Sequence, residues 1–251
     1  MSGKEGLPKL FFELASVARL DILYELQKGN LRMQQIARRL GITPTEAFRQ
    51  LERLGAASLV QRRPDSAFAL TEYGEQVLQI SASLAFISRH REYFSTHELT
   101  KLPAQFVSRL GELSGAELEA NTIETLNKGA DAFTKAKRYI WGVGEGSIPG
   151  HMVPVMNEQV QSGIDVRMLI SGPRLPHTEN LPQVPRNVET RILDDCPVMI
   201  ALTESDAVVT LCQVGGRTDY AAFVGNNPVF HEWVRDVFLY YWEMGKRIPT
   251  R

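Results

Sequence analysis

Residues 30–74 read NLRMQQIARRLGITPTEAFRQLERLGAASLVQRRPDSAFALTEYG, and this stretch decides the fold of the first part of the chain. The run MQQIARRL places Ile36, Ala37 and Leu40 on one side and polar side chains on the other, which is the pattern of a short amphipathic helix. Gly41 follows it, and glycine suits a helix end that turns into the left-handed region. The pattern predicts a short helix that stops at this glycine.

A second helix is predicted directly after the glycine. Thr43 is a good N-cap, Pro44 suits the first helical position, and Glu46 completes a capping box. Apolar residues then recur from Ala47 onward at the i, i+4 and i+7 spacing of one helix face. Two helices joined by a tight glycine turn are the helix-turn-helix, whose second helix enters the major groove of DNA.

A basic hairpin follows the two helices. Residues 59–63 read as a strand, 64–66 as a turn and 67–71 as the returning strand. Arg62 and Arg63 stand just before the tip, within reach of phosphates or of a minor groove. The hairpin is therefore predicted to be the wing of a winged helix.

The charge of the chain is unevenly distributed. Residues 28–63 hold eight Lys or Arg and two Glu, a net charge of +6, while the whole chain carries −1 and its remainder −7. A basic segment on an acidic body is the electrostatic pattern of a DNA-binding domain attached to something else. We expect binding that weakens steeply with salt.

The expected DNA contacts come from both helices and the wing. Thr45, Arg49 and Gln50 are expected to face the bases, and the other arginines to face phosphates. The full expected set is Gln34, Arg38, Thr43, Thr45, Glu46, Arg49, Gln50, Arg53, Arg62, Arg63 and Ser66.

The pattern xTPTEAxRQLxRL…LVxRR…xLTxxG in this stretch resembles the winged-helix domains of ArsR-type and related archaeal transcription regulators. The resemblance implies that double-stranded DNA is the partner and that the protein is a regulator, not an enzyme.

Composition and cysteine use indicate an ordinary globular protein. The chain has 251 residues, enough for two domains, and is 43% hydrophobic and 23% charged. No signal peptide or membrane-spanning run is expected, so the sequence predicts a cytoplasmic protein without a membrane partner. Cys196 and Cys212 are expected to be reduced core residues, with a redox switch as the alternative. The scattered histidines predict no metal site and no cofactor.

Two further helices are expected beside the DNA-binding unit. Residues 9–27 are expected to form its first helix, with Leu14, Val17, Ala18, Ile22 and Leu26 buried. The helix expected at 72–95 carries an apolar stripe at nearly heptad spacing, made of Tyr73, Val77, Ile80, Leu84, Ile87 and Phe94. We expect this stripe to form a homodimer; packing under its own DNA-binding domain is the alternative. The domains are expected at 1–71 (winged helix), 72–97 (linker and dimerisation helix) and 98–251 (effector sensing).

Residues 98–251 alternate between strand and helix patterns. Strands are expected at 138–143, 165–170, 188–193, 197–203, 207–213 and 220–224. Helices are expected at 104–113, 120–137, 152–162 and 228–244. This alternation predicts an α/β sheet.

The order of these elements is similar to half of a phospholipase D-like fold. It also resembles the effector domain of archaeal regulators that include the methanogenesis regulatory proteins, above all in REYFSTHELTKLPAQFVSRLGEL at 91–113. An active phospholipase D-like enzyme carries His-x-Lys-x4-Asp. With Asp206 at the aspartate position, Met199 and Ala201 occupy the histidine and lysine positions. The resemblance therefore implies a phospholipase D-like domain without catalytic residues, which suits a sensor.

A ligand in an open α/β sheet usually binds at the carboxyl ends of the strands. The residues expected there are Trp141, Glu145, Arg167 and Arg174. Trp141 offers a flat apolar surface and the arginines offer charge for an anion. The alternatives are that Trp141 belongs to the core and that Arg174 is a solvated loop charge.

These observations predict a dimeric, sequence-specific DNA-binding transcription regulator. Its fold class is an α+β winged helix-turn-helix joined by a long helix to an α/β phospholipase D-like domain that senses a small-molecule effector or mediates assembly. Two alternatives are a phosphodiesterase- or nuclease-like enzyme and a winged helix that binds proteins.

Overall fold

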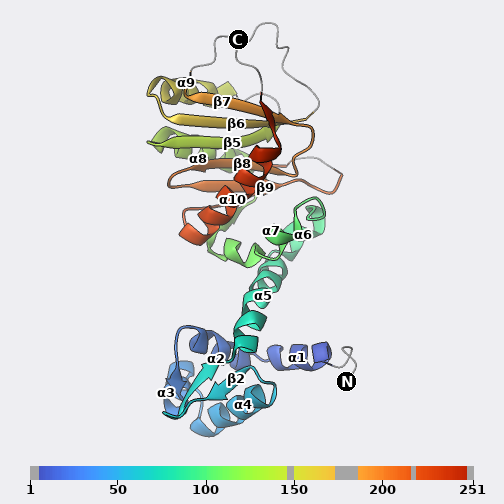
Figure 1. Cartoon of the computed structure of the whole chain (residues 1–251), viewed down its shortest axis with the longest axis vertical. Coiled ribbons are helices and arrows are strands. Elements are labelled where there is room, and N and C mark those ends of the chain that lie inside the picture. The colour runs from blue at the N-terminus through green and yellow to red at the C-terminus, as the bar shows by residue number, and fades with distance from the viewer. Residues whose placement is uncertain (1–5, 146–149, 173–185, 216–218, 248–251) are drawn as a thin grey trace. The chain divides into compact units, whose positions relative to one another are not determined.

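The computed structural model describes residues 6–145, 150–172, 186–215 and 219–247. The chain folds as two compact units, Met1–Ala82 and Ser83–Arg251 (Figure 1). The expected fold class is confirmed: the first unit is a small helical domain with a three-stranded sheet, and the second is an α/β unit with a large mixed sheet.

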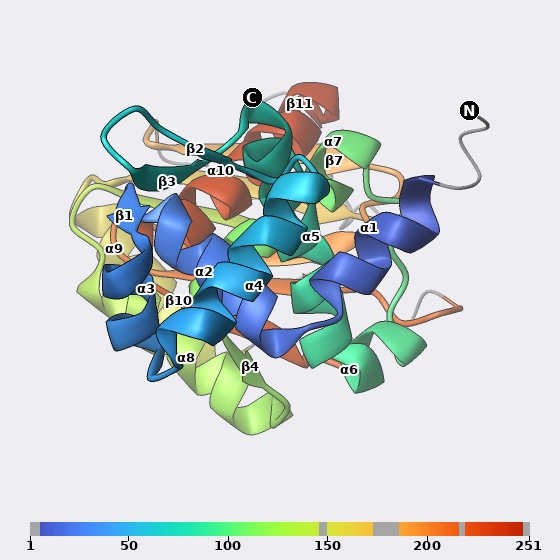
Figure 2. The same cartoon turned by 90° about the horizontal axis from the view of Figure 1, so that it is seen from below.

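The N-terminal unit is a winged helix-turn-helix (Figure 2). Its elements are α1 (Gly6–Leu14), α2 (Val17–Gln27), β1 (Leu31–Arg32), α3 (Met33–Leu40), α4 (Pro44–Ala56), β2 (Val60–Arg62) and β3 (Ala67–Leu70). The strands pair antiparallel in the order β1-β3-β2. Ile22, Ile36, Leu51 and Leu54 are buried together and hold the helices on the sheet.

The helix expected at 9–27 is broken into α1 and α2. The guanidinium of Arg19 explains the break, because it donates to the backbone oxygens of Phe12 at 2.8 Å and Glu13 at 2.7 Å, at the end of α1. Val17, expected in the core, is 74% exposed. The sequence pattern missed this break because apolar side chains continue through it.

The helix expected at 72–95 is also two helices, α5 (Glu72–Arg89) and α6 (Arg91–Thr96). Thr71 caps α5, since its Oγ1 accepts from the N–H of Gly74 at 2.9 Å. The backbone of His90, at φ −105° and ψ 34°, lies between the two helices. The first of the two helices therefore ends six residues before the expected end at residue 95.

The helix α5 supplies core residues to both units. Val77 and Leu78 are buried in the core of the N-terminal unit. Phe86, on the same helix, is buried in the core of the C-terminal unit, as is Tyr93 on α6. The boundary between the units falls inside α5, so this helix is not a free linker.

The C-terminal unit is built on an eight-stranded sheet in the order β11-β7-β6-β5-β8-β9-β10-β4. Its strands are β4 (Glu117–Glu119), β5 (Tyr139–Glu145), β6 (Asp165–Ser171), β7 (Val188–Leu193), β8 (Val198–Thr203), β9 (Ala207–Leu211), β10 (Ala222–Gly225) and β11 (Lys246–Arg247). The helices are α7 (Ala104–Val107), η1 (Leu110–Gly115), α8 (Thr122–Lys135), η2 (Gly150–Met152), α9 (Val153–Gln161) and α10 (Pro228–Met244). Strands β5, β6 and β7 are parallel, and the other pairs are antiparallel.

Helices cover both faces of this sheet (Figure 1). Trp233, Val237 and Phe238 of α10 are buried on one face with Val143 of β5. Phe133 of α8 and Met156 of α9 are buried on the other face with Ile140 of β5. Alternate side chains of one strand thus serve two cores, as the pleat of a strand requires.

Several short elements of this unit differ from what the sequence patterns predict. The expected helix at 104–113 is the single turn α7 followed by the 3₁₀ helix η1. The strands β4 and β11, which pair with β10 and β7 at the sheet edges, were not expected. Two or three residues are too few to establish a periodicity, so only their pairing reveals them.

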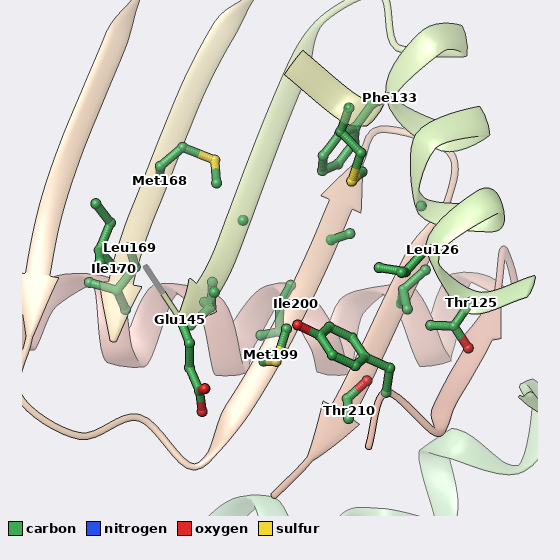
Figure 3. A pocket seen from close by; sticks show the side chains of 18 residues that line it. Thr125, Leu126, Phe133, Glu145, Met168, Leu169, Ile170, Met199, Ile200 and Thr210 are labelled. Atoms are coloured by element: carbon green, nitrogen blue, oxygen red, sulfur yellow. The ribbon is translucent and has the colours of Figure 1, made fainter. Parts of the chain in front are cut away.

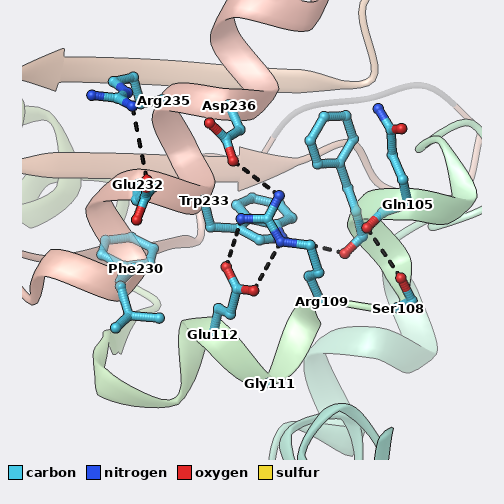
Figure 4. Close-up of polar contacts among 12 residues, drawn as sticks. Gln105, Ser108, Arg109, Gly111, Glu112, Phe230, Glu232, Trp233, Arg235 and Asp236 are labelled. Carbon is cyan, nitrogen blue, oxygen red and sulfur yellow. Dashed lines mark hydrogen bonds and ion pairs between the residues drawn. The ribbon is translucent and has the colours of Figure 1, made fainter. Parts of the chain in front are cut away.

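An ion-pair cluster fastens α10 to the segment α7–η1 (Figure 4). Arg109 donates to both carboxylate oxygens of Glu112 at 2.8 Å and to Asp236 of α10 at 2.9 Å. The hydrogen bonds to Glu112 are the main reason that the pKa of Arg109 is raised. Trp233 of α10 adds a bond from its Nε1 to the backbone oxygen of Phe106 at 3.3 Å.

Candidate nucleic-acid interface and ligand pocket

The turn between α3 and α4 has the glycine and the N-cap that the sequence predicts, whereas the Glu46 side chain does not return the bond to the Thr43 N–H that a capping box needs. Gly41 lies in the left-handed region at φ 66°, and its N–H donates to the backbone oxygen of Ala37. Thr43 is the N-cap of α4, because its Oγ1 accepts from the N–H of Glu46 at 3.1 Å. These bonds occupy the Thr43 hydroxyl within the protein and fix where α4 begins.

The exposed face of α4 consists of Thr45, Phe48, Arg49 and Glu52. They follow the i, i+3, i+4 and i+7 spacing of one helix face. Phe48 is 53% exposed and was not among the expected contacts. Its position between Thr45 and Arg49 on the same face could have identified it from the sequence.

Gln50 does not lie on this face, which corrects its expected contact with the bases. It is 7% exposed and belongs to the buried side of α4 with Ala47 and Leu51. Its Oε1 accepts from Nη1 of Arg19 at 3.1 Å. Gln50 follows Arg49 by about 100° around the helix, which is enough to turn it into the core.

Arg53 is held by groups of its own unit. Its guanidinium donates to both carboxylate oxygens of Glu13, at 2.8 Å and 3.2 Å, and lies 5.2 Å from the ring of Phe12. The hydrogen bonds to Glu13 raise the pKa of Arg53. Arg53 therefore ties α1 to α4, and a phosphate would have to compete with Glu13 for it.

The exposed polar side chains of α3 differ in their partners. Gln34 and Arg38 are exposed on α3. Arg39, next to Arg38, pairs with Glu25 at 2.8 Å. Hydrogen bonds from Lys28 and then from Arg39 lower the pKa of Glu25.

The wing presents both of its arginines. Arg62 and Arg63 are exposed at the end of β2. Nη2 of Arg62 donates to Oγ of Ser66 at 3.2 Å, across the turn. Ser66 is in the left-handed region at φ 64°, and the turn is closed by the bond from the N–H of Arg63 to the backbone oxygen of Ala67 at 2.7 Å. This turn holds the two guanidinium-bearing residues at the tip.

A pocket of about 130 Å³ lies on the α8 face of the large sheet (Figure 3). It is lined by Thr125, Leu126, Gly129, Phe133, Gly142, Val143, Gly144, Glu145, Met152, Met168, Leu169, Ile170, Met199, Ile200, Ala201, Val208, Thr210 and Tyr220. Met199 and Ala201, which stand where a phospholipase D-like enzyme carries histidine and lysine, are both in this lining.

The expected ligand residues do not come together. Glu145 lines the pocket, but Trp141 and Arg167 belong to the opposite, α10 face. The ring of Trp141 stacks on the ring of Phe238, with 5.1 Å between the ring centres. The guanidinium group of Arg167 lies 4.7 Å from the centre of the Trp141 ring. In the register of β5 and β6, Trp141 stands opposite Arg167, so these two side chains share the α10 face, whereas Glu145 is the last residue of β5 and lines the pocket from the strand end. Arg174 lies outside the described residues.

Arg167 and Trp141 are joined by a shared acid. Nε1 of Trp141 donates to Oδ2 of Asp165 at 2.9 Å, and Nε of Arg167 pairs with the same oxygen at 3.1 Å. The polar groups of the expected anion site are thus satisfied by each other.

The structure offers no metal-ligand cluster among the residues it describes. Cys196 and Cys212 form no disulfide with each other, and burial raises the pKa of Cys196 to about 12, which keeps that thiol protonated. Within the described ranges, no helix is long and apolar enough to cross a membrane.

Solved structures similar to this chain include TrmBL2, described as an archaeal chromatin protein with a novel mode of DNA binding. The similarity covers 90% of this chain and 92% of TrmBL2, at 14% identity and a TM-score of 0.46. Nuc from Salmonella typhimurium, a phospholipase D family member, is similar over 48% of this chain and 88% of its own, at 12% identity and a TM-score of 0.34. NucT from Helicobacter pylori is similar over 53% of this chain and 98% of its own, at 10% identity and a TM-score of 0.40. These likenesses are distant.

No curated protein matches the chain. A family model does match the first unit: residues 16–62 fit the model described as "Bacterial regulatory protein, arsR family". The matched segment begins just before α2 and ends with β2, so it contains both helices of the helix-turn-helix and the first strand of the wing. Residues 16–62 are accordingly a helix-turn-helix of the arsR regulatory type.

Proposed function

We propose that the protein is a dimeric transcription regulator in which α4 reads an operator and the C-terminal unit senses a small molecule without catalysis. The observation that carries the proposal is the exposed face of α4 with Arg49 at its centre, inside the segment that matches the arsR family. A second helix exposed in this way is placed to enter the major groove.

The proposed base contacts are Thr45, Phe48 and Arg49. An arginine at this position can pair with the O6 and N7 of guanine, and a phenylalanine can contact the methyl group of thymine. Gln34, Arg38, Arg62 and Arg63 are the proposed phosphate contacts. Thr43, Glu46, Gln50, Arg53 and Ser66 hold the geometry of these elements through the bonds described above.

An exposed apolar stripe on α5 supports the proposed dimer. Tyr73, Ile80 and Leu84 are 46%, 66% and 53% exposed, whereas Val77 of the expected stripe is buried in its own unit. Helix α1 adds exposed Phe11 and Phe12. Apolar side chains of this size in water favour a second copy of the chain, which would place two copies of α4 on half-sites about one DNA turn apart.

The division of labour along the chain is part of the proposal. Residues 1–71 would read DNA, residues 72–97 would join and pair the subunits, and residues 98–251 would sense the effector. Hydrophobic Met199 and Ala201 in the pocket support a sensor over a phosphodiesterase, because neither can act as nucleophile or hold a phosphate charge.

The test is a fluorescence-anisotropy titration of the full chain on its own upstream DNA, with a random duplex beside it, from about 50 to about 200 mM salt. Selective binding that weakens with salt is expected. Arg49→Ala should cost about 1–3 kcal/mol of binding free energy and relax the sequence preference. Arg91→Ala, an exposed arginine on α6, is the matched control and should bind normally.

Equal, weak binding to both duplexes, or an Arg49→Ala variant that binds like the unaltered chain, would contradict the proposal. Absence of binding at low salt would favour the winged helix that binds proteins.

A further inference from the structure

The pocket on the α8 face has the composition of a site for an apolar molecule. Its walls are formed by Met152, Met168 and Met199 with Leu126 and Phe133. Methionine is unbranched and polarisable, so it adapts its shape to a bound group. An apolar cavity of about 150 Å³ is known to stay dry and to accept benzene, and this pocket has a volume of about 130 Å³.

Backbone features keep the pocket open. A Cβ at Gly142 would lie 2.8 Å from Cε of Met168, so glycine lets the methionine lie across β5 as a wall. At Gly144 a Cβ would meet nothing within 4 Å, because that part of the strand borders open space. Tyr220, also in the lining, has φ 63°, a left-handed conformation that a bulky residue adopts only when its surroundings impose it.

One buried hydroxyl in the lining has no hydrogen-bond partner in the part of the chain that the structure describes. Thr125 of α8 is 5% exposed, and its Oγ1 is a buried oxygen with no hydrogen-bond partner among the residues that the structure describes. Buried polar atoms are nearly always paired, so an exception calls for a ligand or a water. Threonine in a helix populates two rotamers, so rotation about its Cα–Cβ bond can turn the hydroxyl to a bound molecule.

The charge of the lining selects against anions. Among the described residues that line the pocket there is no Lys, Arg or His, and Glu145 is acidic. Figure 3 places Glu145, Met199 and Thr210 at one end of the pocket and Phe133 at the other. A phosphate or carboxylate would lose its hydration and meet no cation among these described residues. The lining therefore disfavours the anionic ligands that Arg167 and Arg174 suggest in the sequence.

We propose that this pocket binds a neutral, largely apolar small molecule, of the size of a substituted benzene, that carries one hydroxyl-type group for Thr125. This ligand would be the effector of the sensor proposed above, so its role in regulation rests on the proposed function. Binding of the ligand to the pocket can be tested without DNA.

The experiment uses the full chain with ¹³C-methyl methionine and three probes of nearly equal shape: benzyl alcohol, toluene and benzoate. We expect benzyl alcohol to shift the methyl signals of Met152, Met168 and Met199 in a saturable way. Met33 in the winged helix and Met244 at the end of α10 are outside the lining and serve as internal controls. Toluene should bind about 3- to 10-fold more weakly, as expected for one lost hydrogen bond, and benzoate at least tenfold more weakly.

Two variants separate the hydroxyl from the cavity. Thr125→Val keeps the shape of the side chain and removes its oxygen, so benzyl alcohol should bind no better than toluene, and the ligand-free protein should be as stable as before or more so. Gly144→Val adds a β-branched side chain into open space without a backbone clash, and it should abolish binding of both probes. Melting curves of both variants show whether they are folded.

Each outcome decides the proposal. Equal affinity for benzoate and benzyl alcohol would overturn the exclusion of anions. Shifts that survive Gly144→Val, or no saturable shift with benzyl alcohol up to its solubility, would overturn the site. An unaltered preference for benzyl alcohol over toluene in Thr125→Val would remove Thr125 from it. Because these signals need no DNA, failure to bind an operator would refute the regulator and leave the pocket intact.

Discussion

The two faces of the large sheet differ in how tightly they are packed and in whether their polar groups are paired. On the α10 face, aromatic rings and guanidinium groups fill the space and satisfy each other: Phe238 stacks between Trp141 and Trp242, and Arg191 lies 4.4 Å from the ring of Trp242. On the α8 face, glycine and methionine leave a cavity, and the buried hydroxyl of Thr125 has no partner among the described residues.

This difference indicates on which face of the sheet a ligand can bind. Large polar and aromatic residues attract attention in a sequence, but here they are structural because their binding capacity is used within the protein. The space for a ligand lies where side chains are small or adaptable. The comparison can be tested by changing one face at a time.

The largest effect is expected on the filled face. Phe238→Ala should lower the free energy of unfolding by about 3–5 kcal/mol, because it removes a fully buried ring from between two others. Phe133→Ala, which borders the pocket, should cost less since part of its surface already faces a cavity. Urea denaturation of both variants measures this; equal losses would mean that the pocket face is packed as tightly as the α10 face.

The two glycines of β5 give the next test. Gly142→Ala should be the more destabilising of the two, by up to about 1 kcal/mol, because its Cβ makes the flexible end of the Met168 side chain move. Gly144→Ala should be nearly neutral, since its Cβ meets nothing within 4 Å. Thermal melts of the pair check the difference. A Gly144→Ala variant as unstable as Gly142→Ala would show that the space beside Gly144 is not open.

An acid on the α10 face predicts a pH dependence. Hydrogen bonds from Arg247 and then Arg191 lower the pKa of Glu189 to about 2. A carboxylate whose folded pKa is depressed stabilises the protein above its unfolded pKa of about 4.3, and that contribution is lost as the pH falls toward 2. Because Arg247 is largely exposed, Glu189→Gln should cost only about 1 kcal/mol at pH 7. In urea titrations at pH 7, 4 and 3 the difference should shrink; a constant difference would contradict the assignment.

The smallest effect is expected at the site that the sequence favoured. Arg167→Met should cost about 0.5–1 kcal/mol, for the lost contact with Trp141 and the lost pair with Asp165. Binding of benzyl alcohol should be unaffected. A changed affinity would show that the α10 face takes part in recognition.

The sequence predicted well the helices that have a long hydrophobic periodicity or a recognisable capping residue. α10 has the expected bounds at 228–244, since its proline and its run of aromatic residues mark it, and the glycine turn of the helix-turn-helix is where it was expected. The hydrophobic periodicity of the sequence did not predict that Gln50 is buried or that Trp141 lies on the α10 face of the sheet. Both depend on distant partners, Arg19 in one case and Phe238 in the other. Thr125 gave no signal, because an unpaired hydroxyl is defined only by what surrounds it.

The shared helix α5 has a consequence for how the protein comes apart. A fragment that ends at residue 71 would lose Val77 and Leu78, and one that begins at residue 98 would lose Phe86 and Tyr93, so each would expose a hole in its core. Neither unit is a self-sufficient folding module at the expected borders. Fraying of α5 removes core residues from both units at once, so loss of structure in one is expected to lower the protection of the other's backbone amides against hydrogen exchange.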